Sequence, residues 1–109
     1  MALHNLTIDI HCQRPTWVFE DVNSQYKNPR YRLYVDDTLL VERIWVWGDA
    51  QFIREALVVD LVSGVEHTLT IEPILINPTQ AKFNAVELKD NGGLKPANYI
   101  SEIELTFNT

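Results

Sequence analysis

Arg30-Tyr-Arg-Leu-Tyr-Val-Asp-Asp-Thr-Leu-Leu-Val-Glu42 is the stretch that decides the fold class, and Gly64-Val-Glu-His-Thr-Leu-Thr-Ile-Glu72 repeats its pattern. In both segments apolar and polar residues alternate with a period of two. Successive side chains of a β-strand point to opposite faces, so this alternation predicts strands that bury one face. The same signal predicts the remaining strands over residues 6–13, 16–22, 39–47, 52–61, 81–89 and 99–107.

About eight short strands with almost no helix are typical of an all-β fold, here an antiparallel β-sandwich of jelly-roll type. Residues 1–109 are short enough to form one domain. The terminal segments Leu6–Gln13 and Ile100–Phe107 are similar in length and pattern, and we expect them to pair antiparallel. Because Ala56–Val59 is apolar on both faces, Phe52–Leu61 is expected to be a central strand. A short helix over Ala50–Leu57 is the alternative.

Composition narrows the function classes. Hydrophobic residues make up 46% of the chain, an ordinary share for a folded domain. The formal net charge of −6 argues against binding to nucleic acid or to an anionic membrane, which needs basic patches. The single cysteine, Cys12, shares the apolar face of its strand and is expected to be buried and unreactive. No signal peptide and no apolar run long enough to span a membrane are expected.

Three short segments carry a family resemblance: Val35-Asp36, Leu61 to Gly64, and His67-Thr68. They resemble the second half of galactose-binding-like jelly rolls, a group that includes non-catalytic carbohydrate-binding modules. The common pattern there is a strand ending in Val-Asp-Gly, a strand ending in Leu-x-x-Gly-x-His-Thr, and a strand with a terminal β-bulge. This chain has Asp37 where that turn usually carries glycine, and the residues that usually hold calcium or sugar have no match.

The chain is also similar to small β-sandwich proteins that tailed bacteriophages, especially marine ones, encode as part of the virion. This resemblance spans roughly residues 30–90. It implies a non-enzymatic virion structural protein, made in the host cytoplasm, that serves as a head decoration, cement or fibre-associated subunit. Its partners would be other virion proteins or copies of itself. A carbohydrate-binding module that takes a glycan is the alternative, and a subunit of a host complex is a third interpretation.

The candidate binding residues are Trp17, Trp45, Trp47 and Arg43. Either of the two faces of the predicted strand over 39–47 could pack into the core. If the face with Leu40, Glu42, Ile44 and Val46 is buried, then Trp45 and Trp47 point outward with Arg43 and form a binding surface for protein or sugar. If the other face is buried, the tryptophans belong to the core or to a subunit interface. The sequence leaves both open.

No motif for catalysis or metal binding accompanies these residues. His4, His11 and His67 lack the spacing of a zinc site. Turn formation explains the acidic and amide residues that could bind calcium, because they form no Asp-x-Asp-x-Asp-Gly loop. These candidate calcium residues are Asp36, Asp37, Asp60, Asp90 and Asn91. The sequence therefore predicts no catalytic residue, no metal, no cofactor and no enzymatic activity.

Overall fold

The structure, a computed structural model, describes residues 2–13, 28–46, 51–75 and 81–109. Within these residues it contains nine strands and no helix. The strands are β1 (Ala2–Gln13), β2 (Arg30–Val35), β3 (Thr38–Ile44), β4 (Gln51–Leu61), β5 (Glu66–Ile74), β6 (Lys82–Asp90), β7 (Gly93–Leu94), β8 (Ala97–Ser101) and β9 (Glu104–Asn108).

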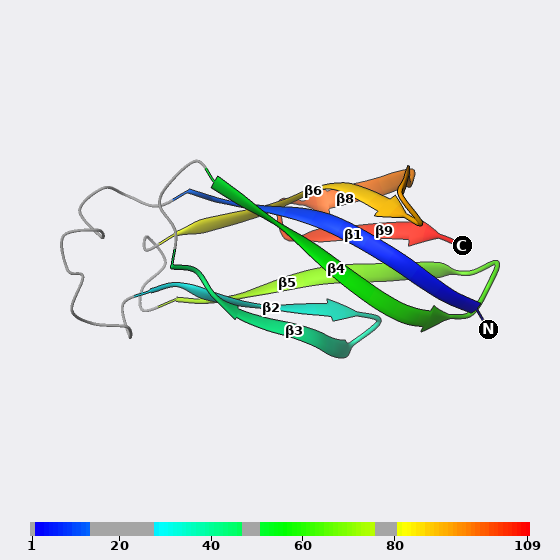
Figure 1. Cartoon of the computed structure of the whole chain (residues 1–109), viewed down its shortest axis with the longest axis horizontal. Coiled ribbons are helices and arrows are strands. Elements are labelled where there is room, and N and C mark those ends of the chain that lie inside the picture. Colours follow the sequence, from blue (N-terminus) through cyan, green and yellow to red (C-terminus); the bar gives the residue numbers. More distant parts are fainter. Residues whose placement is uncertain (1, 14–27, 47–50, 76–80) are drawn as a thin grey trace.

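The strands form two sheets that pack face to face (Figure 1). One sheet has the order β4-β1-β6-β7, and the other has the order β3-β2-β5-β9-β8. All of the neighbouring strands run antiparallel. The predicted all-β antiparallel sandwich is therefore confirmed.

The core lies between the sheets and follows the predicted alternation. On β1 the side chains of Leu6, Ile8, Ile10 and Cys12 are buried, as the period of two requires. Aromatic rings fill one end of the core, where Phe83 meets Tyr31 and Trp45 in edge-to-face contacts, with ring centroids 5.0 and 6.1 Å apart. Such contacts add specific geometry to the burial of apolar area.

Two hairpin turns form at residues expected to favour turns, whereas Asp60, also expected to form a turn, lies in strand β4. Asp36 and Asp37 between β2 and β3 have φ of 49° and 67°, and Asn91 and Gly92 between β6 and β7 have φ of 52° and 84°. Two consecutive left-handed residues are the mark of a type I′ turn, whose twist matches that of the flanking strands. Asp, Asn and Gly tolerate this conformation better than other residues.

The predicted pairing of the terminal strands is wrong. β1 lies between β4 and β6, whereas β9 lies between β5 and β8 in the other sheet. Both edges of β1 are occupied along most of its length, so no edge remains for β9. The segment predicted as one strand over 99–107 also breaks at Glu102-Ile103, because residues 97–101 and 104–108 fold back on each other as a hairpin.

The predicted strand over 52–61 is confirmed as β4, so the helical alternative is wrong. Its predicted central position is also wrong, because β4 lies at the edge of its sheet in the described part of the chain. Within the described residues no further layer covers the apolar side chains on its second face. Val58 points outward and is 67% exposed. The predicted strand over 16–22 lies outside the described residues.

Candidate functional site

The structure places two of the four predicted binding residues. Trp45 is fully buried in the core, and Val41 and Arg43 lie on the same inward side, so the face with the tryptophan is the buried one. Glu42, Ile44 and Val46 face outward. Arg43 remains half-buried, with 38% of its side chain exposed. Trp17 and Trp47 lie outside the described residues.

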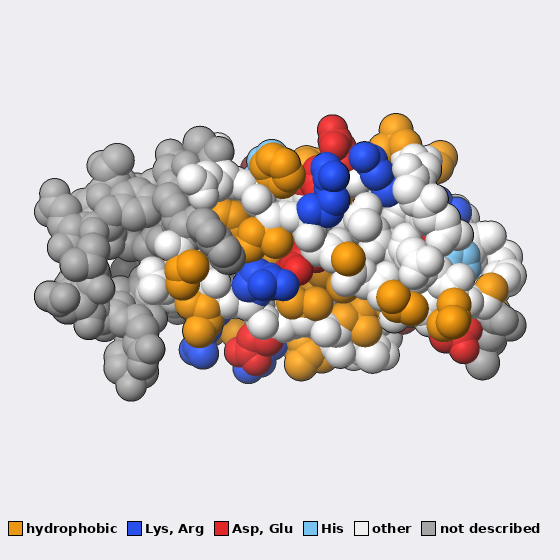
Figure 2. All heavy atoms as spheres, in the orientation of Figure 1, with side chains coloured by type: hydrophobic (Ala, Val, Ile, Leu, Met, Phe, Trp, Pro, Cys, Tyr) orange, Lys and Arg blue, Asp and Glu red, His pale blue; other side chains and the backbone are white. Residues whose placement is uncertain are grey.

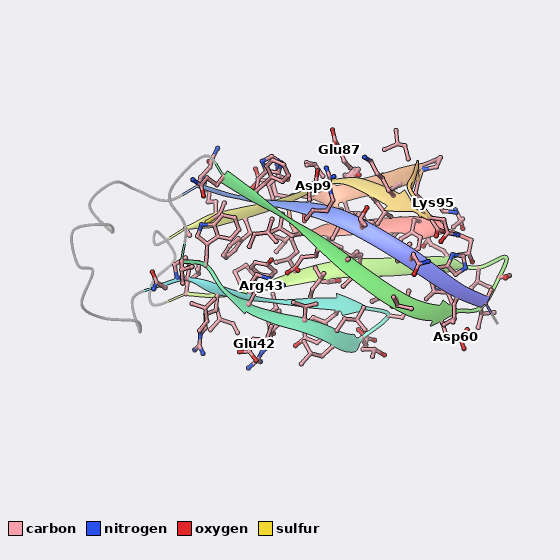
Figure 3. All side chains as sticks on the ribbon, in the orientation of Figure 1. Asp9, Glu42, Arg43, Asp60, Glu87 and Lys95 are labelled. Atoms are coloured by element: carbon pink, nitrogen blue, oxygen red, sulfur yellow. The ribbon has the colours of Figure 1, made fainter. Side chains whose placement is uncertain are left out.

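Arg43 belongs to a polar group between the sheets that we call the seam cluster, formed by Tyr31, Arg43 and Glu55. The Arg43 guanidinium donates to both Glu55 carboxylate oxygens, from Nε and from one Nη, at 2.7 Å each. The Tyr31 hydroxyl donates to the same carboxylate at 2.6 Å. Figure 3 shows Arg43 between the ribbons of the two sheets. Tyr31 lies on β2, Arg43 on β3 and Glu55 on β4, so the cluster joins one sheet to the other.

The electrostatics of the seam cluster favour its paired state. Burial, together with the hydrogen bond to Glu55 and the charge of that carboxylate, raises the pKa of the Tyr31 phenol well above its usual range. The hydrogen bond to Glu55 raises the pKa of the Arg43 guanidinium despite partial burial. Tyr31 therefore remains a protonated donor and Arg43 a cation. The arrangement holds Glu55 in place and leaves the phenol unsuited to act as a base or nucleophile.

Glu55 was missed in the sequence as a member of this site, although the signal was present. Glu55 has the same parity as Ile53, Leu57 and Val59, so it must point inward with them. A carboxylate at an inward position requires a partner. Arg43 lies on the inward side of β3, an edge strand of the other sheet, and its positive charge pairs with the Glu55 carboxylate.

A second polar group forms where the three segments that carry the family resemblance come together, namely Val35-Asp36, Leu61 to Gly64 and His67-Thr68. The carboxylate of Asp36 accepts a hydrogen bond from the Thr68 amide at 2.9 Å and contacts His67 Nδ1 at 2.5 Å. His67 Nε2 lies 2.9 Å from the Val62 carbonyl and 3.3 Å from the Thr109 hydroxyl. These contacts join the β2–β3 turn, the β4–β5 turn and the end of the chain. Asp36 and His67 thus have a structural role, because their contact holds the two turns together. We call this group the Asp36–His67 cluster.

Both nitrogens of His67 face oxygen acceptors, which favours the doubly protonated ring. Burial lowers the pKa of the imidazole, but the hydrogen bonds to Asp36 and to the Val62 carbonyl, with the charge of Asp36, outweigh it. The pKa of His67 is therefore raised above its ordinary value of 6.5. The Asp36–His67 cluster is an ion pair below this raised pKa.

The third candidate region is the outer face of β4 and its edge. Arg54 is half-exposed and donates to Asp9 on β1 from Nε at 2.8 Å and from one Nη at 3.2 Å. The Arg54 hydrogen bond, outweighing burial, lowers the pKa of the Asp9 carboxyl. Phe52 stacks on His11 with ring centroids 5.1 Å apart. Figure 2 shows hydrophobic side chains scattered among charged ones over this face of the molecule.

In the described part of the chain the edge of β4 away from β1 is free, and the peptide groups along it belong to the residues whose side chains face outward. The Ala85 amide donates to the Glu102 carbonyl, away from β1, so the amide of its partner Ile10 faces β4. Ile10 opposes Ile53, and the peptide groups of Ile53 and of every second residue after it therefore face β1. The intervening peptide groups face the free edge; they are those of Phe52, Arg54, Ala56, Val58 and Asp60.

The described surface carries several grooves. One of about 490 Å³ lies between β6 and β8 and includes Tyr99 and Leu94. A second of about 460 Å³ includes His11, Lys82 and Glu102. A smaller one of about 240 Å³ lies along the seam between β3 and β4 and includes Leu40 and Asp60. No group of three potential metal ligands occurs in the described ranges. In the same residues no helix could cross a membrane.

Comparison of the chain with protein-family models, with curated proteins and with solved structures gives no match.

Proposed function

We propose that this chain is a non-enzymatic structural protein that acts through protein–protein contacts, as a subunit of a tailed-phage virion. The observation that carries the proposal is the edge position of β4. This strand has eleven residues, and in the described part of the chain only β1 pairs with it. An open strand edge is a template for another strand, and the exposed side chains of Phe52 and Val58 add apolar contact area beside it.

The use of the buried charged and polar residues supports a structural role. Glu55 is held by Arg43 and Tyr31, and the nearly buried Asp9 is held by Arg54. His67 lies against Asp36. Each group stabilises the contact between strands or turns in its paired form. Together they suit a stable, compact module whose partners bind its outside.

The virion assignment rests on the resemblance of residues 30–90 to small phage β-sandwich proteins. It is tested at the level of the gene and the particle. The chain should be encoded among head or tail genes, and an antibody raised against the purified chain should label purified virions of that phage. A locus without virion genes, or virions that lack the chain, would overturn the assignment.

The alternative of a carbohydrate-binding module is weakened by the position of Trp45. A sugar platform needs an exposed ring, and Trp45 is fully buried. Glycan-array measurements on the purified chain separate the two functions. The proposal predicts no saturable binding, whereas a specific glycan bound with saturation would favour the carbohydrate-binding module.

A further inference from the structure

The edge strands of the two sheets differ in how open they are to another strand. β7 has two residues, and β8 has five with an irregularity between Tyr99 and Ser101. β3 has seven residues, and its ladder shifts register opposite Leu33 and Tyr34. Short edges and bulges prevent unwanted strand pairing. β4 has neither protection, because its ladder with β1 runs without a shift from Gln51 to Leu61.

We propose that β4 pairs antiparallel with β4 of a second copy of this chain, across a twofold axis, and so joins the two β4-containing sheets into one continuous sheet. This inference rests on the proposed function and names the partner of the same surface. The peptide groups of the outward-facing residues supply the donors and acceptors. A strand paired with its own copy is self-complementary, as a twofold interface requires.

The outward side chains select one register. The faces of both sheets stay aligned only when residues of equal parity oppose each other. With Leu57 opposite Leu57 of the second copy, Arg54 opposes Asp60 and Ala56 opposes Val58. The same register brings Phe52 toward Val62, the residue that directly follows the end of β4, and both side chains are about half exposed in the single chain. Each opposed pair is then either oppositely charged or apolar, which is favourable across strands.

Registers shifted by two residues in either direction lose this match. With Ala56 opposite Ala56, Arg54 opposes Val58 and Phe52 opposes Asp60. With Val58 opposite Val58, Ala56 opposes Asp60, and Arg54 loses its acidic partner. Each of these registers places a charged side chain directly opposite an apolar one, so the register centred on Leu57 is preferred.

Arg54 has the capacity for a second carboxylate. Its contacts with Asp9 use Nε and one Nη, and a guanidinium carries five N–H donors. Among the described residues Asp9 is the ion-pair partner of Arg54, and the charge of Glu87 also acts on this guanidinium. Asp60 is exposed near the end of β4 (Figure 3), and no ion-pair partner for it occurs among the described residues. In the proposed dimer the two residues form a pair twice, once on each side of the axis.

The side chains of β4 that point into the core are also compatible with this pairing. Leu57 would face Leu57, and Ile53 would face Leu61. Glu55 would lie beside Val59 of the second copy, but Arg43 already neutralises its charge. An inward charge usually guards an edge strand, and here its partner from β3 removes that effect.

Analytical ultracentrifugation over a concentration series tests the dimer, with Asp60→Arg as the test variant. This substitution places a second guanidinium opposite Arg54 at two symmetric positions, so the dimer dissociation constant should rise by about tenfold or more. Glu66→Arg is the control, because it makes the same charge change at an exposed position on the other sheet. Equal dissociation constants for the two variants, or a monomer at every concentration of the unmodified chain, would overturn the proposal.

Disulfide formation tests the register without relying on the charge variant. Paired residues in neighbouring strands have Cα atoms close enough for a disulfide. A mixture of Ala56→Cys and Val58→Cys chains, carrying tags of different mass, should give the mixed cross-linked dimer much faster than either variant alone. The unmodified chain controls for Cys12, which is buried. Faster cross-linking of Ala56→Cys with itself would overturn the register.

The two proposals fail in different ways. A chain that is present in virions but monomeric in solution would overturn the dimer and leave the virion role standing. A dimer that follows these predictions, formed by a chain that virions lack, would overturn the virion role and leave the interface standing.

Discussion

Arg43 and Glu55 lie on edge strands of different sheets, and two hydrogen bonds of 2.7 Å join the guanidinium to both carboxylate oxygens. This bidentate geometry is the strongest form of the arginine–carboxylate pair. Glu55 is 3% exposed, so its charge depends on Arg43 and on the Tyr31 hydroxyl. The pair therefore closes one side of the sandwich and also keeps a buried charge satisfied.

Removal of Arg43 should destabilise the fold more than removal of an exposed arginine. Arg43→Met leaves Glu55 buried with Tyr31 as its remaining partner, and we expect a loss of about 2–3 kcal/mol in unfolding free energy. The loss lies at the low end for buried pairs because the Arg43 side chain is partly exposed. Urea unfolding followed by circular dichroism measures it.

Arg32→Met is the matched control, because Arg32 makes longer contacts with Glu42 and Glu72 on the outer face. It should cost no more than about 0.5 kcal/mol. The double variant Arg43→Met with Glu55→Leu should recover most of the loss, since no unpaired charge remains. A double variant that is as unstable as Arg43→Met would contradict this account.

The Asp36–His67 cluster predicts a pH dependence of stability. Because the pKa of His67 is raised in the folded chain, its contribution is fully present below the ordinary value of 6.5 and is lost as the pH rises through the folded pKa. The unfolding free energy should therefore be higher near pH 6 than above the folded pKa. Urea unfolding at several pH values, with an NMR titration of the His67 ring, provides the measurement.

Asp36→Asn should lower the pKa of His67 and flatten this dependence, because asparagine fits the left-handed turn but carries no charge. Asp37→Asn is the control, since Asp37 is the next residue of the same turn and the His67 ring contacts Asp36 instead. If both variants flatten the dependence equally, the ion pair is not its cause.

The β2–β3 turn predicts a stabilising substitution. Asp37 has φ of 67° at the second central position of a type I′ turn, where glycine is strongly preferred. Asp37→Gly should raise the unfolding free energy by about 0.5 kcal/mol, after allowance for the greater freedom of glycine in the unfolded chain. Thermal unfolding measures the gain. Gly92→Ala, which puts a side chain at φ of 84°, should instead lower the stability, and a loss on Asp37→Gly would show that Asp37 makes a compensating contact.

Local signals predicted much of this fold correctly. The period of two in β1 places Leu6, Ile8 and Ile10 in the core, and Asp36-Asp37 and Asn91-Gly92 form the turns that their residue types favour. These features depend on a few adjacent residues. Sequence periodicity therefore determines the class of the fold and the faces of most strands.

The order of the strands depends on long-range pairing, which the pattern does not encode. Ala56 and Val58 made β4 look central because apolar residues on both faces usually mean two packed layers. In the structure one of these faces is exposed at a sheet edge. Glu55 was overlooked because its partner lies in another sheet and comes twelve positions earlier. An inward charge with an inward arginine on a second strand is the signal that would have found the seam cluster.

Trp45 provides the last prediction, because its burial separates a structural tryptophan from a sugar-binding one. Its side chain is fully buried against Phe83, so Trp45→Ala should lower the unfolding free energy by about 3–5 kcal/mol. Leu94→Ala, at a position that is 72% exposed, should change it by less than about 0.5 kcal/mol. Trp45→Phe keeps an aromatic ring and should remain folded with a smaller loss, which makes it the variant to use on glycan arrays. The unmodified chain and Trp45→Phe should behave alike there, without saturable binding. A Trp45→Ala chain that keeps its full stability but loses a specific glycan would show that this ring contacts ligand and not the core.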